Sequence, residues 1–250
     1  MTYQRGKCLY EGKASTLYEA VDEHDQVVSD LLIINRKDDI TKLDGEVRST
    51  IEGKGAYTNR ISNCLFRMLE GEGIQTHLVC ELSAHETLIK RTTPLQLEVI
   101  VRNIATGSLC KRLPIAEGAI LEAPIIELDF KSDEYHDPLI NHSHAFALGV
   151  VDDTRALYDI EDMAAHINIV LQDFFSDIGI TLVDFKLEFG RLANGEIILI
   201  DEISPDTCRL WDMKTGQKLD KDVFRKGMGD DATLVAYREV FDRLAERSQD

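Results

Sequence analysis

The sequence lacks the features of a membrane protein, a secreted disulfide-rich protein or a zinc protein. No run approaches about 18 uninterrupted apolar residues, and the N-terminus, MTYQRGK, has no apolar signal stretch. The five cysteines are an odd number without Cys-x-x-Cys spacing, which favours reduced thiols. His136, His142 and His144 match no common zinc pattern. We therefore expect a cytoplasmic protein.

Basic residues are also scarce. The chain has 28 Lys and Arg against 45 Asp and Glu, a formal net charge of -17. This balance argues against nucleic acid or an anionic membrane as the main partner, because both require a basic face. With 250 residues, 44% of them hydrophobic and 29% charged, the chain is long enough and apolar enough to bury a core.

No internal repeat or low-complexity linker divides the chain, so domains must be inferred from changes of pattern. Short strands are predicted at 7–10, 17–20, 27–34 and 87–91, around one helix at 57–70. Beyond Thr92-Thr93-Pro94 the predicted elements are a strand at 97–103, a helix at 159–177, a charged hairpin and a helix at 233–247. We predict an α+β fold of two lobes, 1–93 and 94–250, with mostly antiparallel sheets, flanking helices and a ligand cleft between the lobes.

The most informative segment is the hairpin that begins VDFKLEFG at residues 183–190. Alternation sends Asp184, Lys186 and Glu188 to one face and apolar side chains to the other. By itself this pattern is typical of the solvated face of an amphipathic strand. The return strand, however, is apolar on both faces and then ends in Asp201 and Glu202. This pattern favours a functional site at the end of the strand.

The turn of this hairpin sets which acids face each other. Asn194-Gly195 is a strong signal for a two-residue turn, which would place Ala193 opposite Glu196. Glu188 would then lie directly opposite Asp201. Like charges facing across a ladder are destabilising, so the pairing predicts a divalent cation between them, with Mg²⁺ the natural choice.

Two other segments could bind anions. Residues 9–18, LYEGKASTLY, form a turn in which Gly12 and Ala14 allow a polyanion near the backbone while Lys13 supplies charge. Residues 101–112, VRNIATGSLCKR, combine Arg102, a bidentate donor, with the hydroxyl of Ser108. The first segment lacks Gly-x-x-x-x-Gly-Lys, and a Gly-Lys turn by itself is usually just solvated; for the second segment alone, an exposed basic turn is an equal alternative.

In order, these segments resemble the phosphoribosylaminoimidazole-succinocarboxamide synthase (SAICAR synthetase) family of purine biosynthesis. The resemblance rests on five motifs, which are YEGKA at 10–14, VRN with GSL at 101–109, DEYHDP at 133–138, VDFKLEFG at 183–190, and DE, SPD and RLWD within 201–212. It implies an ATP-dependent ligase that joins the carboxylate of the ribotide CAIR to the amine of L-aspartate. It also implies a two-lobed fold, related to the ATP-grasp group, with ATP in the cleft between the lobes.

The resemblance assigns a role to each motif. Gly12, Lys13 and Ala14 would hold the ATP phosphates, and Lys90 would lie on the strand lining the adenine pocket. CAIR would be bound by Arg102, Ser108 and Arg209. Mg²⁺ would be bound by Glu188 and Asp201, in agreement with the predicted pairing. The reacting centre would be lined by Asp137, Asp184 and Lys186, with Asp184 a candidate base for the aspartate ammonium.

The chain departs from the family pattern at two places. Ser15 stands where many relatives carry Lys or Arg, which weakens one phosphate contact and gives Lys13 more weight. Thr207-Cys208 replaces the small residues usual before Arg209.

Two other functions use part of the same pattern. A small-molecule kinase would share the phosphate loop and the paired carboxylates. A nucleotide sensor would need the phosphate loop but not the ribotide residues. For the ligase we expect a homodimer whose ligands are small molecules.

Overall fold

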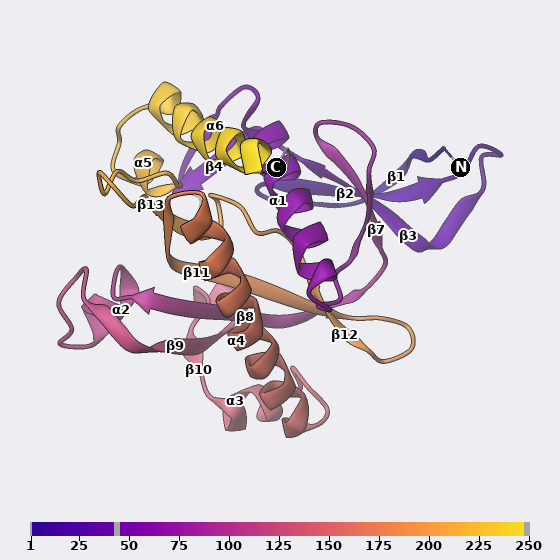
Figure 1. Ribbon diagram of the computed structural model, residues 1–250. Helices are drawn as coiled ribbons and strands as arrows, with labels where there is room; N and C mark the ends of the chain where they lie inside the picture. The colour runs from indigo at the N-terminus through magenta and orange to yellow at the C-terminus, as the bar shows by residue number, and fades with distance from the viewer. Residues whose placement is uncertain (1, 43–45, 248–250) are drawn as a thin grey trace.

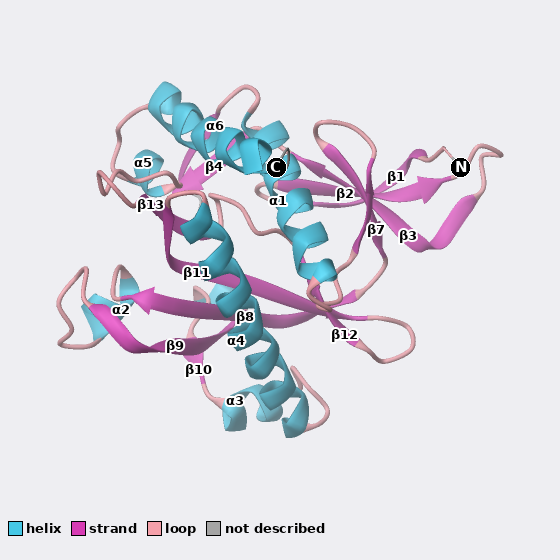
Figure 2. Ribbon diagram, viewed as in Figure 1, coloured by secondary structure: helices cyan, strands magenta, loops and turns pink. Residues whose placement is uncertain are grey.

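The computed structural model describes residues 2–42 and 46–247 and contains two main antiparallel sheets (Figures 1 and 2). The first sheet has the order β1 (Gln4–Glu11), β2 (Ser15–Val21), β3 (Val27–Arg36), β7 (Glu86–Lys90) and β6 (Leu78–Glu81). The second has the order β10 (Leu139–Ile140), β9 (Ile120–Phe130), β8 (Thr93–Ile104), β11 (Ile180–Arg191) and β12 (Ile197–Ile200), and β13 (Cys208–Asp212) also pairs with β11. A small hairpin joins β4 (Asp39–Lys42) to β5 (Val47–Thr50). The predicted α+β class with antiparallel sheets is confirmed.

Three long helices flank the sheets, as the sequence predicted, although each begins earlier than expected. They are α1 (Lys54–Gly71), α4 (Thr154–Asp177) and α6 (Asp230–Arg247), and the short helices are α2 (Ser108–Arg112), α3 (His142–Ala147), α5 (Asp222–Arg225) and the 3₁₀ turn η1 (Asp133–Tyr135). The Asp153 side chain accepts a hydrogen bond from the Arg155 amide at 2.9 Å. This cap satisfies a free amide of the first turn and sets the start of α4.

Helix α4 lies across one face of the second sheet, where it contacts β11, β8 and β9 (Figure 1). Alternate side chains of β11 point into this layer, and Phe185, Leu187 and Phe189 are buried in the main core. The opposite face carries Asp184, Lys186 and Glu188, as the alternation predicted. This face is not solvated, however, because Asp184 and Glu188 are only 4% and 5% exposed.

Strand β12 connects the two sheets. The Leu199 amide donates to the Gln75 carbonyl at 3.0 Å, and the His77 amide donates to the Leu199 carbonyl at 3.0 Å. Residues 75–77 lead directly into β6 of the first sheet, so β12 is covered on both sides. Burial of Ile198, Leu199 and Ile200 explains why this strand is apolar at consecutive positions.

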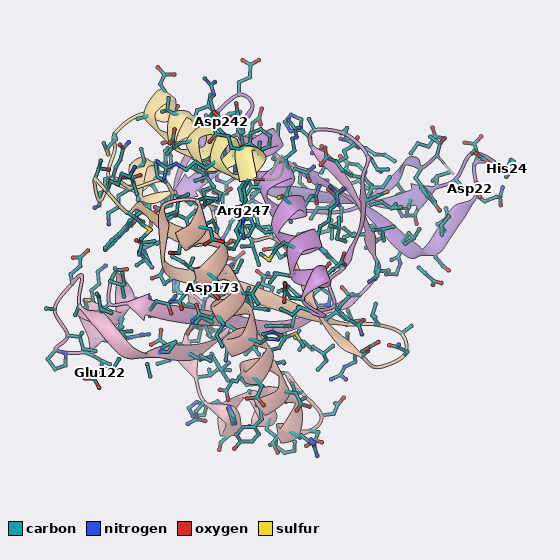
Figure 3. The ribbon with its side chains drawn as sticks, viewed as in Figure 1. Asp22, His24, Glu122, Asp173, Asp242 and Arg247 are labelled. Atoms are coloured by element: carbon teal, nitrogen blue, oxygen red, sulfur yellow. The ribbon has the colours of Figure 1, made fainter. Side chains whose placement is uncertain are left out.

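Many acidic side chains lie on the outside of the molecule, although a minority, such as Asp184 and Glu188, are buried. Asp22, Glu122, Asp173 and Asp242 all project outward from different elements (Figure 3). None of the helices in the described ranges is long and apolar enough to cross a membrane. Because negative charge is dispersed over the surface, a place where cations outnumber acids stands out. Such a place indicates an anion-binding surface.

Candidate active site

A cavity of about 400 Å³ opens beside the charged face of β11. It brings together seven of the residues selected from the sequence, which are Lys13, Arg102, Ser108, Asp137, Asp184, Lys186 and Arg209. These residues come from five separate stretches of chain, so the fold collects them from distant positions. Their chemical roles stay predictions, which we take up below.

Asp184 joins the two predicted ribotide arginines. Its Oδ2 atom accepts from Arg102 Nη1 at 3.2 Å and from Arg209 Nη1 at 2.7 Å. Arg102 is paired with Asp184 across the β8–β11 ladder and also donates to Ser108 Oγ at 2.9 Å. Its Nε atom donates to Glu127 at 2.7 Å. The guanidinium groups are therefore fixed in orientation before any ligand arrives.

Lys186 lies between two buried acids. Its Nζ atom is 2.6 Å from Glu98 Oε1 and 3.3 Å from Glu188 Oε1, and Lys131 contacts the other oxygen of Glu188. Burial alone would lower the pKa of Lys186, but the charges of Glu188 and Glu98 raise it instead. The ammonium therefore stays charged throughout the physiological range. Burial, followed by repulsion from Asp201, raises the pKa of Glu188.

The predicted register of the hairpin is wrong by one residue. Glu188 pairs with Ile200, and the Leu192 amide donates to the Glu196 carbonyl at 2.8 Å, so Ala193 does not face Glu196. The turn holds three residues, 193–195, rather than two, and its last residue, Gly195, has a φ of 91°. Such a three-residue loop with glycine in a left-handed conformation is itself a common hairpin connection.

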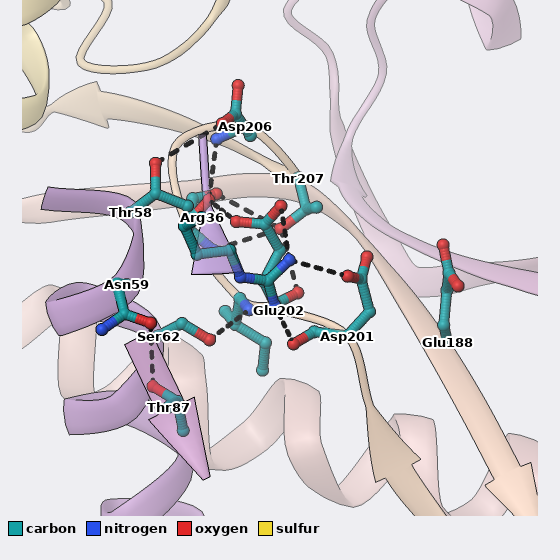
Figure 4. Close-up of polar contacts among 12 residues, drawn as sticks. Arg36, Thr58, Asn59, Ser62, Thr87, Glu188, Asp201, Glu202, Asp206 and Thr207 are labelled. Atoms are coloured by element: carbon teal, nitrogen blue, oxygen red, sulfur yellow. Dashed lines mark hydrogen bonds and ion pairs between the residues drawn. The ribbon is translucent and has the colours of Figure 1, made fainter. Parts of the chain in front are cut away.

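Asp201 nevertheless turns toward Glu188, because it lies beyond the end of β12. Its φ is 64°, a left-handed conformation that few residues other than glycine adopt. Arg36 holds it there, with Nη1 3.0 Å from Asp201 Oδ1 and Nη2 bonded to the Asp201 carbonyl. In Figure 4 the Asp201 side chain lies between Arg36 and Glu188, and its charge helps to raise the pKa of Glu188 after burial. The two acids are therefore neighbours for a reason other than strand pairing.

Two buried cations near the site were not selected from the sequence. Arg36 is 3% exposed and also lies 3.5 Å from Glu202 (Figure 4). Lys54 is 1% exposed and lies 2.6 Å from Asp206. Burial would raise the pKa of Asp206, but the ammonium groups of Lys54 and Lys221 lower it. The only signal in the sequence was the Gly-Lys-Gly at 53–55 and the basic pair Arg36-Lys37 that follows the strand predicted at 27–34.

The hairpin at 9–18, which the sequence predicts to bind phosphates, lies at the edge of the cavity. The Gly12 amide donates to the Ser15 carbonyl at 2.8 Å, and a Cβ on Gly12 would approach the Tyr10 ring to 3.1 Å. Lys13 pairs with Asp133 at 2.6 Å, while Ala14 accepts from the Lys37 amide at 2.8 Å. A neighbouring cavity of about 250 Å³ is lined by Gly12, Lys13 and Lys37, among others.

Lys90 lies apart from this hairpin, at the end of β7. Its Nζ atom donates to the Thr76 carbonyl at 2.8 Å. This contact places Lys90 beside the segment 75–77 that joins the two sheets.

Glu188 and Asp201 fit a magnesium ion that travels with a nucleotide. Across residues 2–42 and 46–247, no cluster of three or more His, Cys, Asp or Glu side chains is arranged to hold a metal by itself. Mg²⁺ does not need one, since it is usually bound by one or two carboxylates together with water and phosphate oxygens. Burial, and then the charge of Asp201, raise the pKa of Glu188, and a cation bound between the two acids would offset both effects.

Comparisons with known proteins agree on one family. The sequence profile of SAICAR synthetase matches residues 8–244. A phosphoribosylaminoimidazole-succinocarboxamide synthase of Fusobacterium nucleatum is 49% identical over 98% of this chain and 99% of its own. One from Methanopyrus kandleri is 46% identical over 96% of this chain and 94% of its own.

Solved structures give the same result. A SAICAR synthetase in complex with ADP superimposes with a TM-score of 0.87 at 44% identity, over 95% of this chain and 97% of its own. The phosphoribosylaminoimidazole-succinocarboxamide synthase of Ehrlichia chaffeensis superimposes with a TM-score of 0.89 at 38% identity, over 96% and 98% of the two chains.

Proposed function

The chain belongs to the SAICAR synthetase family, and from this premise we propose how its residues carry out the family reaction. The enzyme is a ligase that forms a carbon–nitrogen bond. It joins the carboxylate of CAIR to the amine of L-aspartate and gives SAICAR, ADP and phosphate. The observation that carries the residue assignment is the single cavity that gathers Lys13, Arg102, Asp184, Lys186 and Arg209.

The ribotide subsite is formed by Arg102, Ser108 and Arg209. Arg102 is already bonded to Ser108, and both arginines share Asp184, so their remaining N–H groups form a preorganised set of donors. Planar guanidinium groups suit the bidentate binding of phosphate and carboxylate. Fixing them in advance lowers the entropy lost when the ribotide binds.

The nucleotide lies against the hairpin that carries Gly12, Lys13, Ala14 and Ser15, in the cleft between lobes 1–93 and 94–250. Lys13 is held by Asp133, whose side chain is 80% exposed, so a triphosphate can displace that partner at little cost. Lys90, beside the segment that joins the sheets, borders the adenine end.

Glu188 and Asp201 hold Mg²⁺. When bound, the ion neutralises charge on the phosphate oxygens and orients them. The two acids are held meanwhile by Lys131 and Arg36. Lys131 is 43% exposed and can move aside, whereas Arg36 is buried and keeps Asp201 in place.

The reaction then needs two displacements. An oxygen of the CAIR carboxylate attacks the γ-phosphorus, and ADP leaves. The amine of aspartate attacks the carbonyl carbon of the resulting mixed anhydride, and phosphate leaves. Lys186 stays charged and stabilises the negative charge that develops, while Asp184 and Asp137 orient the amine and accept its protons.

An assay of ADP release in which each substrate is omitted in turn tests this function. We expect release only when ATP, CAIR, L-aspartate and Mg²⁺ are all present. Release that needs CAIR but not aspartate would identify a kinase, and tight ATP binding without turnover would identify a sensor. We also propose a cytoplasmic homodimer, which light scattering coupled to size-exclusion chromatography would test.

A further inference from the structure

Three cations in the cavity have no role in the reaction as proposed above. They are Lys42 at the end of β4, Lys221 just before α5, and Arg225 in α5. Arg225 donates to Asp222 at 2.6 Å and is thereby paired. The reaction also leaves one anion without a binding group, because L-aspartate brings two carboxylates and the other cations of the cavity are assigned to the nucleotide, the ribotide and the charge that develops during the reaction.

Lys42 carries a charge that its surroundings do not neutralise. Its Nζ atom donates to the backbone carbonyl of Phe224 at 3.3 Å and lies 5.1 Å from the centre of the Phe224 ring. Among the described residues it has no ion pair with a carboxylate. A carbonyl and an aromatic face hold an ammonium group in position but leave its charge available to an anion.

Lys221 also lacks a carboxylate within normal hydrogen-bond distance. The carboxylate nearest to it is Asp206 Oδ1 at 3.6 Å, beyond normal hydrogen-bond distance. Asp206 is already bound by Lys54 at 2.6 Å and by the Tyr237 hydroxyl at 2.9 Å. Burial lowers the pKa of Lys221 despite the neighbouring acid, which indicates an ammonium group with too little negative charge around it.

Lys42 and Lys221 both line the cavity, close to α5. Lys42 bonds to the backbone of Phe224, three residues after Lys221, and the Arg225 amide donates to the Lys221 carbonyl at 3.0 Å. The cavity lining holds seven Lys and Arg side chains against four Asp and Glu, in a chain whose net charge is -17. A local surplus of cations in so acidic a protein focuses anions into this cavity.

We propose that Lys42 and Lys221 form a carboxylate subsite that binds the amine substrate, L-aspartate, beside the reacting centre. The assignment rests on the proposed function. The ribotide already has two planar guanidinium groups and a hydroxyl. The other cations of the cavity are paired with acids or assigned to the nucleotide, so Lys42 and Lys221 are the ones left for aspartate. Lys186 and Asp184 line the same cavity, so an amine held by its carboxylate at this subsite faces the groups that act on it.

Steady-state kinetics of Lys42→Met, with each substrate varied separately, tests the proposal. We expect KM for L-aspartate to rise about 10- to 100-fold, the effect of losing one charge-assisted contact, with KM for ATP and CAIR unchanged. Lys42→Arg should recover most of the affinity. Succinate, which has both carboxylates but no amine, should inhibit competitively against aspartate, and its inhibition constant should rise in parallel.

Lys226→Met is the matched control, because Lys226 is exposed just beyond α5 and does not line the cavity. Lys221→Met provides a second variant should Lys42→Met fail to fold. A rise in KM for CAIR instead of aspartate would assign the lysines to the ribotide and overturn the proposal, as would unchanged kinetics in both variants. Wild-type enzyme that does not consume aspartate would instead refute the proposed function, so the two failures are distinct.

Discussion

Glu188 of β11 lies directly opposite Glu98 of β8 in the antiparallel ladder, and Asp129 of β9 lies opposite Glu98 on its other side. Three acids thus cross the sheet in one row, and Asp201 approaches the end of that row. Like charges in facing positions are destabilising. Lys186 and Lys131 offset part of the repulsion, and the rest makes this row receptive to a cation.

Asp201→Asn should remove most of the activity, by at least about 100-fold, because it takes away one of the two carboxylates proposed to bind Mg²⁺. The fold should survive, since the amide oxygen can still accept the hydrogen bond from Arg36. The measurement is the Mg²⁺ dependence of ADP release, which should shift to higher concentration. Glu196→Gln, on the same hairpin but exposed, is the control, and an unchanged Mg²⁺ requirement in Asp201→Asn would refute the metal role.

Arg102→Ala should weaken use of the ribotide about 10- to 150-fold in kcat/KM, or roughly 1.5–3 kcal/mol. It should also lower the free energy of unfolding by about 1–3 kcal/mol, because Glu127 and Asp184 each lose one of their two arginine partners and keep the other. Substrate kinetics at low temperature and denaturant unfolding measure the two effects. Arg155→Ala, on the exposed surface of α4, should change neither, and a loss confined to ATP affinity would place Arg102 in another subsite.

Asp129→Asn should stabilise the protein at pH 8. Burial, and then the charges of Glu127 and Glu98, raise the pKa of Asp129 to about 6, and its Oδ1 atom has no hydrogen-bond partner. The folded state therefore binds more protons than the unfolded state between about pH 4 and 6, and stability falls as pH rises through that window. Above about pH 6, the free energy of unfolding of the variant should exceed that of the wild-type protein by roughly 1–3 kcal/mol.

Urea unfolding at pH 8 and at pH 4.5 checks this effect, which should be small at the lower pH. Glu122→Gln serves as a control because Glu122 is an exposed acid on the same strand (Figure 3). An equal gain at both pH values would mean that the change acts through packing and not through charge.

Cys208 should react slowly with thiol reagents although it lines the cavity. It is 4% exposed, and burial raises the pKa of its thiol, so little of the reactive thiolate forms. Labelling at pH 8 followed by peptide mapping should find Cys8, which is exposed, modified first and Cys208 only after unfolding. Rapid modification of Cys208 in the folded enzyme would show that the cavity opens more than its static shape allows.

Much of the fold follows from local pattern. The alternation at 183–189 predicted which side chains enter the core, and the helix spacing predicted α1, α4 and α6 to within a few residues of their starts. These are properties of neighbouring residues, which sequence periodicity records directly. Local pattern does not decide the length of the turn, because Asn-Gly permits both two- and three-residue hairpin loops. The extra residue shifts the register of the hairpin, so that Glu188 pairs with Ile200 instead of Asp201.

The sequence by itself determined the charged face of β11, the phosphate hairpin and the acids that end β12, because each depends on residues close together in the chain. Only the tertiary structure decided that Glu98 faces Glu188, that Arg36 holds Asp201 near Glu188, and that Lys42 and Lys221 line one cavity. Those contacts join residues tens or hundreds of positions apart. They depend on strand register and helix packing, which no local pattern encodes.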